Sequence, residues 1–348
     1  MQYPGSLTDI AGLKVGHFTD ARRPTGCTVV RCEAGVVCGV DVRGGAPGTR
    51  ETDLLRSENV VDRVHALLLT GGSAFGLDAA GGVMRWLDEN GHGLVVGPAQ
   101  RAGSAGDPAP ASIRVPIVPA AVLFDLWLGD ATLRPDAAAG YAASAAATAD
   151  PVAQGSVGAG AGASVGKLFG IQRAMKGGIG SASLRVGAIT VAALVAVNAI
   201  GDIIDADGQV IAGLRSADGQ SLLRSLDALL AGTGPARIND TMSNTMAGAV
   251  GSATTIGVVA TDAQLSKTAA NKLASLAHHG LSRAINPISV NDGDTLFALA
   301  TGSAGLAGDM SALGAMAAEV VSRAIRNAVW AATGLADPPL PAARDLPR

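Results

Sequence analysis

Residues 254–262 have the sequence Thr-Thr-Ile-Gly-Val-Val-Ala-Thr-Asp, and the interpretation of the whole chain depends on this stretch. Apolar and β-branched residues fill 255–260, which predicts a buried strand. The small and polar residues 251–253 precede it, so a bendable peptide meets a rigid element. Two interpretations of Thr254 stay open at this point. Either Thr254 simply opens the strand, or the chain is cut before it and the freed α-amine serves as a base for its hydroxyl.

Hydrophobic periodicity and turn residues on both sides of this stretch predict an α/β chain of mixed order. Downstream we expect a helix over 263–285, a strand over 295–301 and a long helix over 310–332. Upstream we expect one or two strands over 189–204 around a turn at 198–201, and helices over 137–149 and 220–230. Segments without periodicity predict a loop at 97–112, a plausible lid, and a linker at 236–253. The proline-rich tail 337–348 is expected to be frayed.

The N-terminal part begins with short strands and tight turns. Residues 27–32 and 36–42 are predicted to form a hairpin around a turn at 33–35. A buried strand is predicted over 66–70. Ser73 follows two glycines and is expected to cap a helix that continues to residue 91.

Composition narrows the class of protein. Of 348 residues, 48% are hydrophobic and only 16% are charged, so we expect a homo-oligomer, a tetramer or larger, that hides apolar surface. The net charge of -3 and the aromatic content of 3% argue against nucleic acid as a partner. The longest apolar stretch, 186–201, is shorter than the roughly 20 residues that span a bilayer, which argues against a membrane segment. The start of the chain shows no secretory signal, which predicts a cytoplasmic location.

Cofactor motifs are incomplete in this chain. The three cysteines within 27–38 have no histidine at zinc-ligand spacing, so we expect neither a metal site nor a disulfide framework. The glycines between 158 and 166 are similar to a phosphate-binding loop, but Ala161 and Leu168 replace the glycine and the hydroxyl that such a loop requires. We therefore expect no cofactor.

Ser73 is also a candidate nucleophile. Its setting between Gly72 and Ala74 is similar to the nucleophile elbow of esterases, but Phe75 stands where that motif needs a glycine. Helix capping explains Ser73 better. The five histidines cannot be placed beside a serine and an acid from one sequence, so a hidden catalytic triad stays an alternative.

Other polar residues stand out against apolar or glycine-rich surroundings. Asp292 and Asp294 flank a turn, where they either form an Asx turn or hold an amine and a hydroxyl. Asn198 interrupts an apolar run, so its amide needs partners and could donate to an oxyanion. Lys167 and Lys176 each lie beside glycines and could support charge near a carbonyl or be solvated.

Five stretches occur together in the order that characterises one family of hydrolases. They are 41–53 (DVRGGAPGTRETD), 71–77 (GGSAFGL), 176–180 (KGGIG), 254–262 (TTIGVVATD) and 292–294 (DGD). Together they resemble the DmpA-like family, which contains L-aminopeptidase/D-esterases, β-peptidyl aminopeptidases and nylon-oligomer endo-hydrolases. The likeness extends from about Leu7 to Thr333.

This resemblance implies a four-layer αββα sandwich in a single catalytic domain over 1–335, followed by a frayed tail over 336–348. It also implies a self-processing hydrolase of the N-terminal-nucleophile type. The precursor would cut itself between Ala253 and Thr254 and leave an α chain of residues 1–253 and a β chain of residues 254–348.

The resemblance also assigns roles to the polar residues. Thr254 would attack the substrate carbonyl with its new amine as the base, and Asn198 would donate to the oxyanion. Asp292 and Asp294 would orient the nucleophile. Lys167 matches a lysine of the nylon-hydrolase branch. Lys176 matches the aminopeptidase branch.

Two residues depart from the family pattern. Family members often have Asn or Gly before the nucleophile, whereas this chain has Ala253, and this bears on the rate of self-cleavage. Phe124 stands where several members have a tyrosine, and a phenyl ring cannot donate the hydrogen bond of a phenol. We place Phe124 and Ser73 in the substrate pocket.

The expected function is that of an aminopeptidase or amidase acting on short peptides or on small amides and esters. One alternative is an acyltransferase of the ornithine acetyltransferase type, which would keep the nucleophile but pass the acyl group to an amine. A non-catalytic relative is the other alternative.

Overall fold

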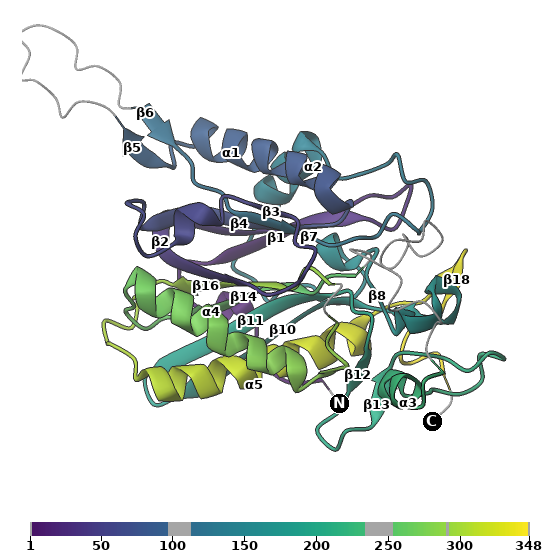
Figure 1. The fold of residues 1–348 in the computed structure, drawn as a ribbon. Helices are drawn as coiled ribbons and strands as arrows, with labels where there is room; N and C mark the ends of the chain where they lie inside the picture. The colour runs from purple at the N-terminus through teal and green to yellow at the C-terminus, as the bar shows by residue number, and fades with distance from the viewer. Residues whose placement is uncertain (1, 97–112, 234–252, 290–291, 347–348) are drawn as a thin grey trace, which may run out of the picture.

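The computed structural model describes residues 2–96, 113–233, 253–289 and 292–346 (Figure 1). Two sheet layers lie face to face, with a pair of helices on each outer side. The upper layer contains β1 (Lys14–Thr19), β3 (Thr49–Arg50), β4 (Arg63–Thr70) and β7 (Ala120–Val122). The lower layer contains β10 (Gly178–Val186), β11 (Ile189–Val197), β14 (Ile256–Thr261) and β16 (Thr295–Ala300).

The helices form the two outer layers. Helices α1 (Ala79–Glu89) and α2 (Ala137–Ala145) cover the upper sheet layer, and α4 (Lys267–Ser282) and α5 (Met310–Ala331) cover the lower one. This is the four-layer αββα arrangement that the sequence predicted. Helix α3 (Ser225–Leu230) lies at the periphery.

One long strand connects the two sheet layers. Strand β2 (Gly26–Val42) pairs with β4 through its first half, where Cys27 lies opposite Thr70, and with β16 through its second half. The predicted hairpin around 33–35 is therefore wrong. The register shifts between Arg31 and Val36, so these turn-forming residues are absorbed as an irregularity within a continuous strand. Four residues of β2 (32–35) lie where β4 has one (65), and extra residues in one strand bend it and increase its twist, which suits a strand that passes from one layer to the other.

The side chains of the two sheet layers belong to three hydrophobic cores: one between the layers, and one between each layer and the helices that cover it. In β14, Ile256 and Val258 point into the core between the two sheet layers, whereas Val259 points into the core under α4 and α5. In the upper layer, Leu68 of β4 packs with Val83 of α1 in the third core. The strands of the lower layer are therefore buried on both faces, which is why their sequences are continuous apolar runs.

Small sheets of two or three short strands lie outside this frame. They are β5 (Leu94–Val96) with β6 (Ile113–Val115), β8 (Ser164–Val165) with β9 (Met175–Lys176), β12 (Asp202–Ile204) with β13 (Val210–Ala212) and β15 (Ile285–Asn286), and β17 (Leu335–Ala336) with β18 (Pro339–Leu340).

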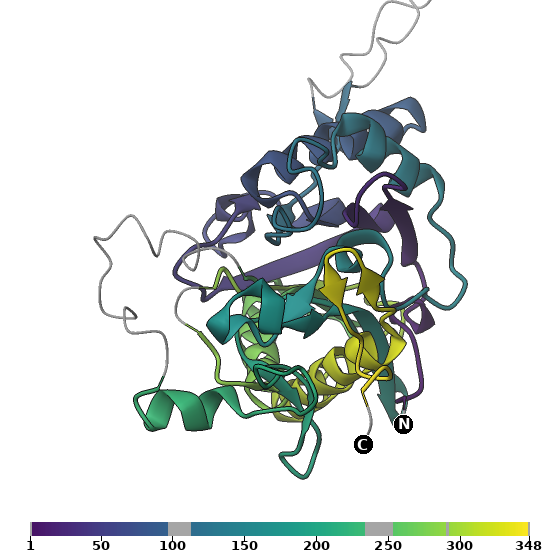
Figure 2. The same cartoon turned by 90° about the vertical axis from the view of Figure 1, so that its right-hand side faces the viewer.

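The predicted frayed tail is ordered as far as residue 346. Figure 2 shows the yellow β17–β18 hairpin beside the teal strands β8 and β9. The backbone N–H of Lys176 donates to the carbonyl of Pro341 at 2.8 Å, and Leu340 and Ala342 are buried. These contacts anchor a segment whose proline content alone indicated a loose end.

Ser73 does not cap a helix as predicted. It begins a 3-10 helix (Ser73–Asp78), its φ is 53°, and its side chain makes no capping hydrogen bond. The left-handed Gly72 before it turns the chain, and the backbone N–H of Ser73 donates to Leu123 at 3.0 Å. A non-glycine residue with positive φ is strained and persists only where its surroundings hold it, often beside a functional site.

The other predicted strands and helices are present with shifted ends. The turn at 198–201 separates β11 from β12 as predicted, and the helices expected at 137–149, 220–230 and 263–285 are shorter in the structure. The predicted loop at 97–112 and residues 236–252 of the predicted linker lie outside the described residues. Within the described ranges, no helix is long and apolar enough to cross a membrane.

Candidate active site

Three strand ends meet at one edge of the lower sheet layer. Strand β14 runs parallel to β16, with Ile256 opposite Thr295, and antiparallel to β11, with Ala196 opposite Ile256. The start of β14, the start of β16 and the end of β11 therefore lie side by side. This topology brings Thr254, Asn198 and the 292–294 turn together, although they are far apart in the sequence.

Thr254 lies buried just before β14, with 3% of its surface exposed. Its backbone N–H donates to the carbonyl of Asn198 at 2.6 Å, and its Oγ1 accepts from the N–H of Gly293 at 3.1 Å. The hydroxyl itself donates to the carbonyl oxygen of Ala253. The Thr254 hydroxyl is therefore in contact with the peptide group that the sequence predicts to be cut.

The side-chain amide of Asn198 is held by donors and an acceptor. Its Oδ1 accepts from Lys167 Nζ at 2.6 Å and from the N–H of Ser164 at 3.0 Å. Its Nδ2 donates to the carbonyl of Phe124 at 2.9 Å. An amide nitrogen carries two hydrogens, and this bond uses one of them. The contact with Phe124 goes through the backbone carbonyl, so it does not depend on the side chain at this position.

The two carboxyl groups of the 292–294 turn are buried. Asp294 Oδ1 accepts from the backbone N–H of Thr255 at 2.7 Å. Asp292 Oδ1 has no hydrogen-bond partner among the described residues. Burial raises the pKa of Asp294 to about 6, and burial together with the charge of Asp294 raises the pKa of Asp292 to about 8. Each carboxyl group therefore ionises at a higher pH than an exposed aspartate does.

Lys167 belongs to this cluster. It begins a short 3-10 helix (Lys167–Phe169) after Gly166, whose φ of 73° turns the chain. Burial lowers the pKa of Lys167 to about 7, against the opposing effect of the charge of Asp292. Lys167 can therefore lose or accept a proton near neutral pH, and it contacts the amide that we expect to donate to an oxyanion.

Lys176 is buried elsewhere and makes a different set of contacts. Its Nζ donates to the carbonyls of Ala161 at 2.8 Å, Ala163 at 2.9 Å and Gly160 at 3.4 Å. Burial lowers its pKa to about 7. Lys176 thus ties the glycine-rich segment to β9, whereas Lys167 bonds to Asn198.

The two lysines are expected to respond differently to replacement by methionine. Lys167→Met should lower kcat by about 100-fold with little loss of stability, because the Asn198 amide loses a charged partner. Lys176→Met should lower the free energy of unfolding by about 1–3 kcal/mol, because buried carbonyls lose their donor. Initial rates and thermal melts of both variants distinguish the two roles. The assignment is wrong if Lys176→Met is inactive at unchanged melting temperature.

Replacing Asp292 by asparagine is expected to change stability in a pH-dependent way. A carboxyl whose pKa is raised on folding stabilises the folded protein at low pH, and this contribution is lost as the pH rises through the folded-state pKa. The free energy of unfolding of Asp292→Asn should therefore rise by about 1–3 kcal/mol, relative to that of the protein with Asp292, between pH 5 and pH 8. Melts on the Thr254→Ala background, which we expect to keep the chain intact, measure this difference. A difference independent of pH would show that Asp292 ionises normally.

A cavity of about 250 Å³ lies over Thr254. Its wall consists of Ala46, Pro47, Gly48, Ser73, Ala74, Val122, Phe124 and Thr254. The structure thus places both predicted pocket residues, Phe124 and Ser73, on the same cavity as Thr254. Polar and apolar atoms both line this wall.

Part of this wall was not singled out from the sequence as a site. Residues 46–48 pack on the 292–294 turn, where the N–H of Ala46 donates to the carbonyl of Asp292 at 3.1 Å. Gly44 permits this approach, because a Cβ there would lie 2.2 Å from the same carbonyl oxygen. The sequence signal was the glycine-rich composition of 41–53, which indicates a close backbone contact but not its partner.

A buried ion pair connects the cavity walls and was also missed. The carboxylate of Asp125, next to Phe124, pairs with Arg23 and accepts from Thr25 Oγ1 at 2.6 Å. It also accepts from the backbone N–H of Gly72 at 3.0 Å. Asp125 thus holds the strand end that carries Phe124 against the turn that carries Ser73.

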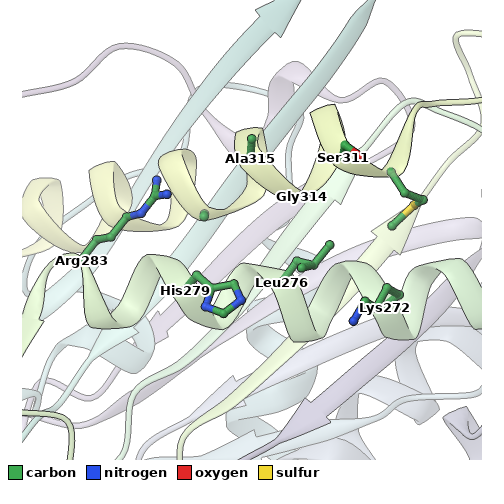
Figure 3. Close-up of a pocket in the computed structure, with 9 residues that line it drawn as sticks. Lys272, Leu276, His279, Arg283, Ser311, Gly314 and Ala315 are labelled. Carbon is green, nitrogen blue, oxygen red and sulfur yellow. The ribbon is translucent and has the colours of Figure 1, made fainter.

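A second cavity, of about 390 Å³, lies between α4 and α5 (Figure 3). Its labelled residues, among them Lys272 and His279, come from these two outer helices, except Arg283, which directly follows α4. None of the predicted site residues lines it. Within the described ranges, no group of three or more His, Cys, Asp or Glu side chains is arranged to hold a metal ion.

The layered fold that carries this buried cluster also occurs in solved aminopeptidases. The solved L-aminopeptidase D-Ala-esterase/amidase of Ochrobactrum anthropi, described as a variant of the Ntn hydrolase fold, matches with a TM-score of 0.66 at 20% identity. The match covers 96% of this chain and 88% of that one. The chain belongs to peptidase family S58, whose sequence profile matches residues 5–338. It is therefore a peptide-bond hydrolase, and the predicted family and fold are confirmed.

Relatives of known sequence carry two kinds of name. An uncharacterised aminopeptidase of Mycobacterium tuberculosis is 42% identical, over 98% of this chain and 97% of its own length. A 6-aminohexanoate-oligomer endohydrolase of Paenarthrobacter ureafaciens is 32% identical, over 92% of this chain and 84% of its own length. The solved β-aminopeptidase of a Burkholderia species matches with a TM-score of 0.63 at 25% identity, over 96% of this chain and 90% of that one.

Proposed function

We propose that this hydrolase is a self-processing aminopeptidase or amidase whose nucleophile is Thr254. The proposal rests above all on one observation. The Thr254 side chain donates to the carbonyl of Ala253 while the same residue lines the cavity. A hydroxyl so placed can act first on its own peptide bond and then on a substrate.

Self-cleavage begins with addition of Thr254 Oγ1 to the carbonyl carbon of Ala253, with loss of the hydroxyl proton. The C–N bond then breaks, its nitrogen takes up the proton that Oγ1 lost, and an ester between Ala253 and Thr254 remains. Water hydrolyses that ester, which leaves a carboxylate on Ala253 and an α-amine on Thr254. The Ala253 side chain takes no part in these steps, so alanine at this position is compatible with the reaction.

Turnover of a substrate uses the new amine as the base. An α-amine has an ordinary pKa of about 7.7 to 8.0, so part of it is neutral near physiological pH. It takes the proton of Oγ1 as the oxygen attacks the substrate carbonyl, and the leaving amine then receives a proton. The remaining N–H of Asn198 Nδ2 donates to the oxyanion. Water finally releases the acyl group from Thr254.

The charged residues support these steps in our proposal. Lys167 polarises the Asn198 amide through its 2.6 Å bond to Oδ1, which makes Nδ2 a better donor. Asp294 holds the N–H of Thr255 and so fixes the start of β14 beside the nucleophile. The negative charge of Asp292 offsets the positive charge of the buried Lys167.

The alternative functions are distinguished by their products. Purified protein is incubated with a panel of short peptides, small amides and esters, with and without an acceptor amine. We expect hydrolysis without the acceptor. Product formed only in its presence would favour an acyltransferase, and an untouched panel would favour a non-catalytic relative. The homo-oligomer and the cytoplasmic location stay predictions.

A further inference from the structure

An exposed aromatic ring continues the cavity wall outward. Phe75 directly follows Ala74, which lines the cavity, and 60% of its surface is exposed. The guanidinium carbon of Arg134 lies 3.7 Å from the centroid of the Phe75 ring. Arg134 is also next to the turn that carries Ser73, because its Cβ lies 3.3 Å from where a Cβ on Gly72 would be. Arg134 is therefore a cation beside the cavity wall.

Arg134 differs from the other arginines that stack on aromatic rings. All four of the others that the structure describes have an oxygen partner in an ion pair or a hydrogen bond: Arg31 with Glu33, Arg85 with Glu89, Arg323 with Glu319, and Arg173 with the carbonyl of Arg215. Among the described residues, Arg134 has neither a hydrogen bond nor an ion pair. Its stacking on Phe75 holds the guanidinium in place but leaves its N–H donors unused.

The acidic residue that interacts electrostatically with Arg134 is Asp130, and its carboxylate is already hydrogen-bonded to Thr132. The positive charge of Arg134 contributes to lowering the pKa of Asp130, but hydrogen bonds from Thr132 are the larger cause. Asp130 Oδ1 accepts from the backbone N–H of Thr132 at 2.8 Å and from its Oγ1 at 2.7 Å. The Asp130 carboxylate is thus hydrogen-bonded within its own turn. The guanidinium N–H donors of Arg134 stay available to an external acceptor.

We propose that Arg134 and Phe75 form a subsite for a carboxylate on the leaving amine of the substrate. The inference rests on the proposed function. The cavity over Thr254 has a volume of only about 250 Å³, so it suits the acyl part of an amide and leaves the rest of the substrate outside. A guanidinium matches a carboxylate with two parallel N–H···O bonds. The favoured substrates are short peptides whose leaving amine carries a free C-terminal carboxylate.

The test compares two substrates that differ only in this charge. An unblocked dipeptide that the enzyme hydrolyses and its C-terminal carboxamide are assayed with the wild type and with Arg134→Gln. In Arg134→Gln we expect the KM for the free acid to be about tenfold higher than in the wild type, which is the effect of losing one charge-assisted hydrogen-bonded contact. The KM for the carboxamide should change less than twofold. Arg134→Lys keeps the charge but loses the forked pair of N–H donors, so its KM for the free acid should lie between that of the wild type and that of Arg134→Gln.

Arg85→Gln is the matched control. Arg85 stacks on Tyr141 and pairs with Glu89, and none of these three residues lines the cavity, so neither KM should change. An active Arg134→Gln enzyme whose two KM values change equally, or not at all, overturns the subsite alone. A wild type that hydrolyses no amide overturns the proposed function, and the subsite falls with it.

Discussion

Replacing Thr254 by alanine is expected to lower kcat/KM for amide substrates by at least about 10⁴-fold. The change removes the only hydroxyl that both lines the cavity and contacts the Ala253 carbonyl among the described residues. Removal of a nucleophile leaves only binding and oxyanion stabilisation, which account for a small part of the rate. Initial rates on the best substrate of the panel measure the loss.

Thr254→Ser is the matched control for this prediction. Serine keeps the hydroxyl and, after cleavage, the α-amine, so activity should stay within about 100-fold of the wild type. Thermal melts establish that both variants are folded. If Thr254→Ala hydrolysed amides at the wild-type rate, another residue would have to be the nucleophile.

Replacing Asn198 by alanine is expected to lower kcat by about 10²- to 10³-fold with a much smaller change in KM. Loss of one donor to an oxyanion has an effect of this size, because the interaction is strongest in the transition state. Asn198 is not among the residues that line the cavity, so the change removes no side chain of the cavity wall. Steady-state kinetics of the mature enzyme separate kcat from KM.

Ser164→Ala serves as the control for Asn198. Its hydroxyl lies 3.4 Å from Asn198 Oδ1, but the backbone N–H at 3.0 Å remains after the change. We expect its kcat to stay within about threefold of the wild type. A kcat for Asn198→Ala that is equally close to the wild type would exclude Asn198 from oxyanion stabilisation.

The lower sheet layer could be predicted from the sequence because both of its faces are buried. Long apolar runs such as β11 and β14 have few alternatives to a buried strand. Strand β2 was predicted wrongly because residues 33–35 favour a turn, and local composition does not distinguish a hairpin from a bent strand. Which of these forms is decided by pairing with β4 and β16, partners that lie elsewhere in the chain.

The polar residues of the site could be predicted only in part. Asn198 and the two aspartates stood out because polar groups next to apolar strands need partners. Asp125 did not stand out, because its partner Arg23 lies about a hundred residues away and no spacing rule connects them. The contacts of the two lysines were equally hidden. Both lie beside glycines, but only Lys167 bonds to the Asn198 side chain.

The state of the chain itself tests the central claim most directly. We would measure the intact mass of the purified wild-type protein and identify the N-terminal residue of every fragment. The account predicts two fragments, residues 1–253 and 254–348, the second beginning with Thr254. A single uncut chain of 34.4 kDa that hydrolyses amides would contradict it.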